Sequence, residues 1–213
     1  MANSSTPLDP FHWLKKHYLI IFTLVLLLYI LLAFLAPILL NAGYTQLGKL
    51  IYRGFSNFCH QYAHRSWFLF GEQAHYPIES RGSALTIFEV FDIPLDHPEL
   101  SREIIGNERA GYKVAVCQRD VALYGAMLLF TLIYIASGKS IAQLPFLLWV
   151  ILAVAPMGVD GLWQLAGSYG LFSSAHESTP LIRSITGAMF GFFSGWILLP
   201  AIERSIQKEQ SNT

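Results

Sequence analysis

One segment near the start of the chain has no place in a water-soluble fold. From Tyr18 to Leu40, 23 consecutive residues include no Asp, Glu, Lys or Arg. At about 1.5 Å per residue, a helix of this length crosses the roughly 30 Å hydrocarbon core of a bilayer. The hydrophobic region of a signal peptide normally ends after about 15 residues, so an uncleaved anchor is the better interpretation, although Lys15 and Lys16 precede it. Residues 17–40 are therefore predicted to form the first transmembrane helix.

Three more apolar segments follow, and the composition agrees with a multi-pass membrane protein. Apolar residues make up 54% of the 213 residues and charged residues 13%, with no net formal charge. The lack of a basic surplus argues against nucleic acid as a partner. Further transmembrane helices are predicted at residues 114–136, 141–165 and 180–202, the last with Pro180 in its first position after a Ser178 or Thr179 cap. The predicted fold class is an all-α membrane protein with four transmembrane helices.

Basic residues predict the orientation in the plasma membrane. With four spans, one side carries five Lys and Arg residues in short flanks: Lys15, Lys16, Lys139, Arg204 and Lys208. The connection between the third and fourth spans, residues 166–179, has none. The positive-inside rule then places residues 1–16 and the tail at 203–213 in the cytoplasm. Residues 41–113, which hold more than half of all charged residues, are expected outside.

The long segment at 41–113 contains one clear amphipathic pattern. Apolar residues from Leu47 to Phe58 recur at helical spacing, with Lys49 and Arg53 on the opposite side. This predicts an interfacial helix that runs into Cys59. The alternative is a fifth, re-entrant segment through residues 67–70. Residues 81–113 alternate polar and apolar residues, with Asp-His-Pro and Gly-Asn turn signals, and are predicted to form a small extracytoplasmic cap.

Five polar residues fall near the predicted outer ends of the helices: Arg119, Asp120, Asp160, Gln164 and Arg183. Ionisable groups in membrane spans are costly, and they usually pair with one another or line a wet cavity. Two interpretations follow. The charges neutralise one another as a structural clamp, or they form a site for a ligand, a metal ion or a proton.

The two cysteines add a second candidate site. Cys59, His60, Cys117 and Asp120 together offer two sulfurs, one nitrogen and one oxygen, a set that a zinc ion or another divalent metal accepts. A disulfide is equally permitted outside the cytoplasm, and two free thiols are the third alternative. His60 and His64 at helical spacing would also suit a metal, but such a pair is a weak signal.

A repeated small-residue pattern marks the last span. Gly187, Gly191 and Gly195 lie four residues apart, so they share one face of the predicted helix. Such a face normally serves close helix packing. Packing within the chain is the first interpretation, and a homo-oligomer is the alternative. The sequence has no Walker loop, dinucleotide fingerprint, nucleophile elbow or zincin motif.

An ordered series of short motifs resembles a known family. The series consists of Phe58-Cys59-His60-Gln61, Arg65-Ser66, Cys117-x-Arg119, Pro156 with Asp160-Gly161 and Gln164, Glu177-Ser178-Thr179, and Arg183 with Thr186-Gly187. It resembles the bacterial membrane protein family called domain of unknown function 2085, over about Tyr52 to Gly191. The resemblance implies a multi-spanning membrane protein and no established activity.

The chain departs from the usual pattern of this family in two places. The family's middle motif usually reads Cys-x-Arg-Cys, whereas Asp120 stands here in place of the second cysteine. A Cys-x-x-Cys redox pair is therefore impossible, and a metal would need Asp120 as a harder ligand. Residues 76–113 also look like an insertion, because the family is typically short there.

Three hypotheses about function follow. The first is a membrane protein whose outer polar cluster binds a small ligand or a metal, or stabilises an assembly, within the lipid bilayer. The second is a membrane-embedded enzyme for thiol or lipid chemistry, with Cys59 or Cys117 as nucleophile and His60 as base. The third is an ion or proton carrier that uses Asp120 and Asp160.

Overall fold

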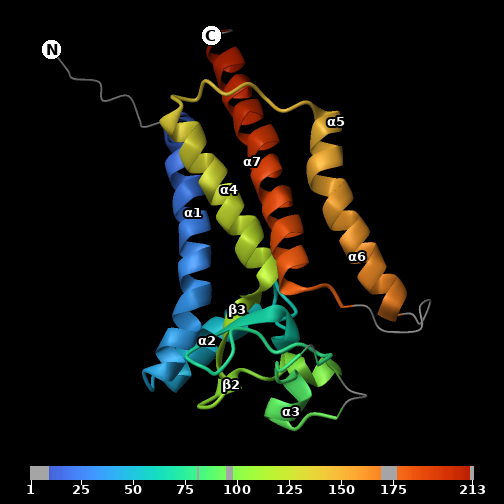
Figure 1. Cartoon of the computed structure of the whole chain (residues 1–213). Coiled ribbons are helices and arrows are strands. Elements are labelled where there is room, and N and C mark those ends of the chain that lie inside the picture. The colour runs from blue at the N-terminus through green and yellow to red at the C-terminus, as the bar shows by residue number, and fades with distance from the viewer. Residues whose placement is uncertain (1–9, 81, 95–97, 169–176, 212–213) are drawn as a thin grey trace, which may run out of the picture.

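The computed structural model describes residues 10–80, 82–94, 98–168 and 177–211 as a helical bundle with a small mixed cap at one end (Figure 1). Four helical segments are long and apolar enough to cross a membrane. They are α1 (Pro10–Asn41), α4 (Gln118–Ala136), the continuous run of α5 (Phe146–Trp149), η3 (Val150–Val154) and α6 (Ala155–Ser168), and α7 (Pro180–Ser211). Four such helices were predicted from the sequence, and this part of the prediction is confirmed.

The bundle is arranged in the order α1, α4, α7 and α5–α6, with the closest packing between α4 and α7 (Figure 1). In the third span η3 is a turn of π-helix that directly precedes Pro156. Proline has no N–H for the helical ladder and its ring crowds the preceding turn, so a widened turn at this point accommodates it. Pro180 begins α7, and the Oγ1 of Thr179 accepts a hydrogen bond from the backbone N–H of Ile182.

The cap contains a three-stranded sheet, which the all-α prediction missed. Its strands are β1 (Ser66–Leu69), β2 (Gly106–Asn107) and β3 (Gly111–Cys117), in the order β1-β3-β2 and antiparallel throughout. The helical pieces of the cap are α2 (Thr45–Phe55), η1 (Ala63–Arg65), α3 (Ile87–Phe91) and η2 (Pro98–Arg102). The amphipathic helix predicted before Cys59 corresponds to α2, which ends at Phe55, short of that cysteine.

Two predicted span boundaries and one alternative segment differ from the structure. Residues 114–117, assigned to the second span, form the end of β3, because their apolar side chains are buried in the cap on both faces of a paired strand. Residues 67–70, the alternative re-entrant segment, include most of β1. Residues 141–145, assigned to the third span, are not helical, since Pro145 sets the start of α5 at Phe146.

The insertion predicted at 76–113 is not a separate unit. It contains α3, η2, β2 and the first part of β3, and β3 pairs with β1 from before the insertion. Apolar residues of β3 and α2 pack against the C-terminal part of α1 in one buried cluster. The cap and the bundle therefore share a core. Parts of several predicted segments lie outside the described residues, namely 1–9, the Asp96-His97 part of the turn, 169–176 and 212–213.

The end of the bundle opposite the cap carries the basic flanks (Figure 1). Lys15 lies 2.6 Å from a carboxylate oxygen of Glu209, and Lys139 lies 2.9 Å from one of Glu203. The hydroxyl of Tyr18 also donates to Glu203, at 2.8 Å. These contacts bring the start of α1, the turn after α4 and the end of α7 together.

Two glycines of α7 permit the close approach of α4. A Cβ built on Gly191 would lie 1.9 Å from the carbonyl oxygen of Leu123, and one on Gly187 would lie 2.5 Å from that of Arg119. A Cβ on Gly195 would meet the ring of Phe130 at 3.1 Å. This glycine face is therefore occupied by α4 within the chain.

We expect Gly191→Ala to lower the stability of the protein, because the new methyl group would force α4 and α7 apart. A cost of about 1–3 kcal/mol is typical of overpacking. The thermal unfolding midpoint in detergent measures it. Gly125→Ala is the matched control, since a Cβ there meets no atom within 4 Å. Equal midpoints for the two variants would contradict the close packing.

Candidate functional site

Three potential metal ligands converge where the cap meets the bundle. Single ligand atoms of Cys59, Cys117 and Asp120 all lie within 4.8 Å of one another. Cys59 follows the turn after α2, Cys117 is the last residue of β3, and Asp120 lies in the first turn of α4. In the described part of the chain, this is the one group of three or more His, Cys, Asp or Glu side chains with such spacing.

Gln61 holds the loop that carries Cys59. Its backbone has a φ of 55°, in the left-handed region, and its side chain is buried. The amide nitrogen donates to the carbonyl oxygens of Tyr52 and Ala115, at 2.9 Å each. Tyr52 belongs to α2 and Ala115 to β3, so one side chain ties the loop to both elements. The backbone positions of Cys59 and Cys117 are thereby fixed relative to one another.

Both cysteines are free thiols in this structure. The thiol of Cys117 donates a hydrogen bond to Cys59, and this lowers the pKa of Cys59 below its usual value, against the effect of burial. The pKa of Cys117 is raised well above its usual value by the same hydrogen bond and by burial. The ionisation of each thiol therefore depends on the other.

A pocket of about 240 Å³ opens beside the two sulfurs. Its walls include Cys59, Cys117 and Asp120, together with Arg119 and Met157. The pocket leaves room for a water molecule or a small ligand next to the potential metal ligands.

His60 lines the same pocket but lies outside the ligand group. Its ring is stacked on that of Tyr62, with 5.8 Å between the ring centroids. Of the four predicted metal ligands, the structure brings Cys59, Cys117 and Asp120 together, and His60 is not part of the group.

A second polar group joins α4 and α6 to the segment before α7. Asp160 accepts hydrogen bonds from the guanidinium of Arg119 and from the hydroxyl of Ser178. The amide of Gln164 donates to the same hydroxyl, at 2.7 Å. The Nε of Arg119 is buried and has no hydrogen-bond partner among the described residues. One donor of the guanidinium is therefore enclosed without a hydrogen bond.

A third group surrounds Glu177. Its carboxylate accepts hydrogen bonds from Arg65, at 2.6 Å, and from Arg183, at 2.8 Å. The Nε2 of His64 lies 3.4 Å from it. Burial opposes ionisation of Glu177, but the hydrogen bond from His64 and the charges of Arg65 and Arg183 outweigh that effect and lower its pKa to about 2. Glu177 therefore ties the cap to the first turn of α7.

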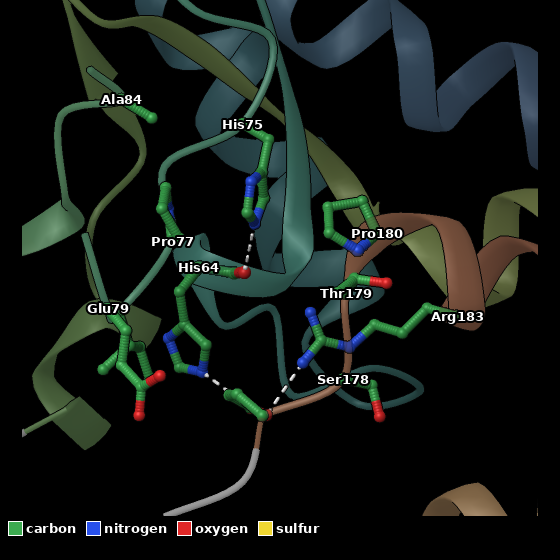
Figure 2. Close-up of a pocket in the computed structure, with 11 residues that line it drawn as sticks. His64, His75, Pro77, Glu79, Ala84, Ser178, Thr179, Pro180 and Arg183 are labelled. Atoms are coloured by element: carbon green, nitrogen blue, oxygen red, sulfur yellow. Dashed lines mark hydrogen bonds and ion pairs between the residues drawn. The ribbon is translucent and has the colours of Figure 1, made fainter. Parts of the chain in front are cut away.

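The close-up in Figure 2 shows His64 and Arg183 approaching from opposite walls of a cavity of about 180 Å³. His64 is buried, and its Nδ1 lies 2.9 Å from the hydroxyl oxygen of Ser101. The ring of His75 contacts the backbone oxygen of His64 at 3.1 Å (Figure 2). Both ring nitrogens of His64 thus have partners that suit a neutral imidazole, one as donor and one as acceptor.

The structure divides the polar cluster predicted from the sequence into three parts. Arg119, Asp160 and Gln164 form one part. Asp120 lies with the cysteines, and Arg183 pairs with an acidic residue that was not in the predicted cluster. Asp160 and Arg183 have different partners, Arg119 and Glu177 respectively.

Sequence reasoning did not place Glu177, Arg65 or Ser178 in a candidate site, and it considered His64 only as a metal ligand together with His60. Glu177 lies 112 positions after Arg65, and no local periodicity connects residues that far apart. The one available signal was the presence of Arg65-Ser66 and Glu177-Ser178-Thr179 among the motifs of the resemblance.

Comparison with known proteins supports the resemblance. The model of the family described as a predicted membrane protein of domain of unknown function 2085 matches residues 97–197. The family resemblance is thus confirmed. The matched residues include the Cys117, Asp160 and Glu177 motifs, and the Cys59 motif precedes them.

An uncharacterized protein of Methanocaldococcus jannaschii is 28% identical to the chain over 202 residues. The match covers 92% of this chain and 99% of the relative. This relative comes from an archaeon, so it lends no support to a bacterial origin. No solved structure matches the chain.

His64 is expected to make stability depend on pH. Burial lowers its pKa below the usual value, against the attraction of Glu177, and the charges of Arg65 and Arg183 act in the same direction as burial. The unfolded chain therefore binds a proton near pH 6.5 that the folded protein does not. Stability should be retained above pH 6.5 and should fall below it, by at most about 1.4 kcal/mol per pH unit.

Unfolding midpoints in detergent between pH 7.5 and 5 test this expectation. His64→Gln should remove this part of the acid sensitivity. His60→Gln, which deletes an exposed ring of the same segment, should keep it. An identical pH profile for wild type and His64→Gln would show that His64 does not titrate on unfolding.

Proposed function

We propose that this membrane protein binds a divalent cation of the zinc type through Cys59, Cys117 and Asp120. The observation that carries the proposal is the convergence of two free thiols and one carboxylate within 4.8 Å. Zinc bonds of about 2.3 Å to sulfur place tetrahedral ligand atoms roughly 3.8 Å apart. Small side-chain adjustments satisfy this spacing, since the backbone is already in place.

The donor set agrees with the chemistry of zinc. Thiolate sulfur is a soft ligand that zinc accepts, and a single carboxylate oxygen is common in its sites. Calcium and magnesium prefer oxygen ligands alone, so the two sulfurs argue against them.

Three protein ligands leave one coordination position for water or a ligand molecule, as in zinc sites that act on or sense small molecules. The pocket of about 240 Å³ supplies the space beside the ligands. Arg119 also lines this pocket, so a cationic side chain forms part of its wall. A binding site open to a small polar or anionic molecule is the function that these contacts support best.

We expect the purified chain to hold close to one zinc ion per molecule after metal stripping and reloading. Cys59→Ser and Cys117→Ser should abolish this binding, and Asp120→Asn should weaken it by about 10-fold or more. Metal analysis and competition titration with a chromophoric chelator measure the effect. His60→Gln and Asp92→Asn, which change side chains outside the ligand group, are the matched controls.

Disulfide mapping by mass spectrometry completes this experiment. A metal-free protein with an intact bridge between Cys59 and Cys117 would refute the metal site. Alkylation separates the proposal from a thiol-dependent enzyme, the second candidate, which the lowered pKa of Cys59 favours. Bound zinc should protect both thiols, whereas fast alkylation of Cys59 in the presence of zinc would favour the enzyme.

We also propose that the cap lies outside the cell membrane and that both termini are cytoplasmic. The positively charged flanks of α1, α4 and α7 gather at the end opposite the cap, as their ion pairs show. The positive-inside rule assigns this end to the cytoplasm. The long cap segment is translocated regardless of its own charges.

Single cysteines introduced into a Cys59→Ser/Cys117→Ser background test this orientation. Glu108→Cys lies at an exposed position of the cap and should react with a membrane-impermeant maleimide on intact cells. Gln207→Cys lies at an exposed position near the end of α7 and should react only after permeabilisation. The reverse pattern would overturn the proposed orientation.

A further inference from the structure

A second pocket, separate from the metal site, collects positive charge beside α2. Its volume is about 450 Å³. Four cationic side chains line it: Lys49 and Arg53 of α2, Arg102 of η2 and Lys113 of β3. Glu103 is the one acidic side chain in its wall. The lining therefore carries a surplus of positive charge.

Lys113 is the least expected of these residues, because its side chain is completely buried. Its Nζ donates to the carbonyl oxygens of Gln61, at 2.5 Å, and Arg102, at 2.9 Å. No carboxylate lies within ion-pair distance of it among the residues that the structure describes. Two of its three N–H donors have partners, and the positive charge itself has no counter-charge.

Burying an ammonium group without an anion is costly. Burial lowers the pKa of Lys113 to about 7; the sulfur of Cys59 opposes this effect, and the neighbouring charge of Arg102 acts in the same direction as burial. An anion that enters the pocket would supply the missing counter-charge and would occupy the remaining donor. The buried lysine thus distinguishes this pocket from an ordinary basic patch at the surface.

Apolar side chains on the other face of α2, and in the turn that follows it, are exposed. Leu47, Leu50 and Phe58 remain 55%, 63% and 80% exposed, so no other part of the described chain covers them. Apolar side chains of an amphipathic helix enter the boundary between headgroups and acyl chains, while the basic side chains stay at the polar side. Lys49 and Arg53, four residues apart, share that polar side.

A separate apolar hollow lies against another face of the same helix. It measures about 580 Å³ and is lined by residues of α1 and α2, including Leu28, Leu32, Ile51 and Phe55. Such a hollow suits an acyl chain. A molecule with both a negatively charged group and an acyl chain matches the two sides of α2.

We propose that the pocket at Lys49, Arg53, Arg102 and Lys113 binds the phosphate group of an anionic phospholipid. The cationic side chains would meet the phosphate oxygens, with Lys113 as the buried donor. None of the four cations belongs to the ligand group of the proposed metal site, so the two sites use different side chains for binding.

The test uses the full chain in detergent with phosphatidylglycerol, phosphatidylcholine or inorganic phosphate as the probe. Phosphatidylglycerol should bind and raise the unfolding midpoint, and phosphatidylcholine should do so much less. Binding should weaken as salt is added, because screening reduces the attraction. Inorganic phosphate that binds as tightly as phosphatidylglycerol would overturn the assignment to a lipid.

Variants locate the effect in the pocket. Arg53→Gln should weaken phosphatidylglycerol binding roughly fivefold, and Lys49→Gln/Arg53→Gln on the order of 25-fold, the scale expected for each basic residue at an anionic membrane surface. Arg109→Gln removes an exposed charge of the cap outside the pocket and should bind as wild type does. Equal losses in Arg53→Gln and Arg109→Gln would refute the site.

Lys113→Met tests the buried donor with a side chain of similar length. The folded variant should lose most of its preference for phosphatidylglycerol over phosphatidylcholine. If it does not fold, native mass spectrometry of lipid retention by Lys49→Gln/Arg53→Gln still decides the outcome. Undiminished retention by that double variant would overturn the proposal, whatever its zinc content.

Discussion

The continuity of β3 with α4 is the constraint on which the rest of the structure depends. Cys117 ends the strand and is also the N-cap residue of the helix, so no flexible linker separates the cap from the bundle (Figure 1). The direction of α4 therefore follows from the pairing of β3 with β1. Residues at this junction face two environments, with the paired sheet on one side and the membrane helices on the other.

Two of the three polar groups of the site start from this junction. Cys117, Arg119 and Asp120 are consecutive or nearly so, yet their side chains belong to two different groups. The turn of the helix separates them, since residues one apart point in directions about 100° apart. The motif from Cys117 to Asp120 thus contributes two potential metal ligands to the cysteine group. Its Arg119 forms an ion pair with Asp160 of α6.

The parts of this fold that local sequence determines were predictable. Long apolar runs identified the four candidate spans, and helical periodicity identified α2. A fully buried strand has no alternating pattern, however, so Val114 to Cys117 could not be told apart from the helix that follows. Cys59 and Cys117 were grouped in the sequence only because both offer sulfur ligands to a metal. The pairing of Arg65 with Glu177 depends on a tertiary contact that no local pattern encodes.

Charge balance around the site permits a metal to bind without large electrostatic cost. Two carboxylates, those of Glu177 and Asp160, are paired with three guanidinium groups, those of Arg65, Arg183 and Arg119. One positive charge is therefore in surplus. Asp120 offsets it when both thiols are protonated. Zinc at the proposed site would replace two thiol protons by two positive charges, so the net charge of the ligand group would not change. The same exchange makes binding tighter as the pH rises, because fewer protons compete for the sulfurs.

The segment from Phe58 to Gln61 forms a shared wall between the two proposed sites. Gln61 lines both pockets, and its backbone oxygen accepts the hydrogen bond of Lys113. Cys59 lies two residues before it on the same loop. An anion beside Lys113 would draw the ammonium toward the pocket and away from that carbonyl, while a metal would hold Cys59 in place. Because interiors are close-packed, a loop fixed at one of these points has little freedom at the other, so occupancy of either site limits the motion available to the second.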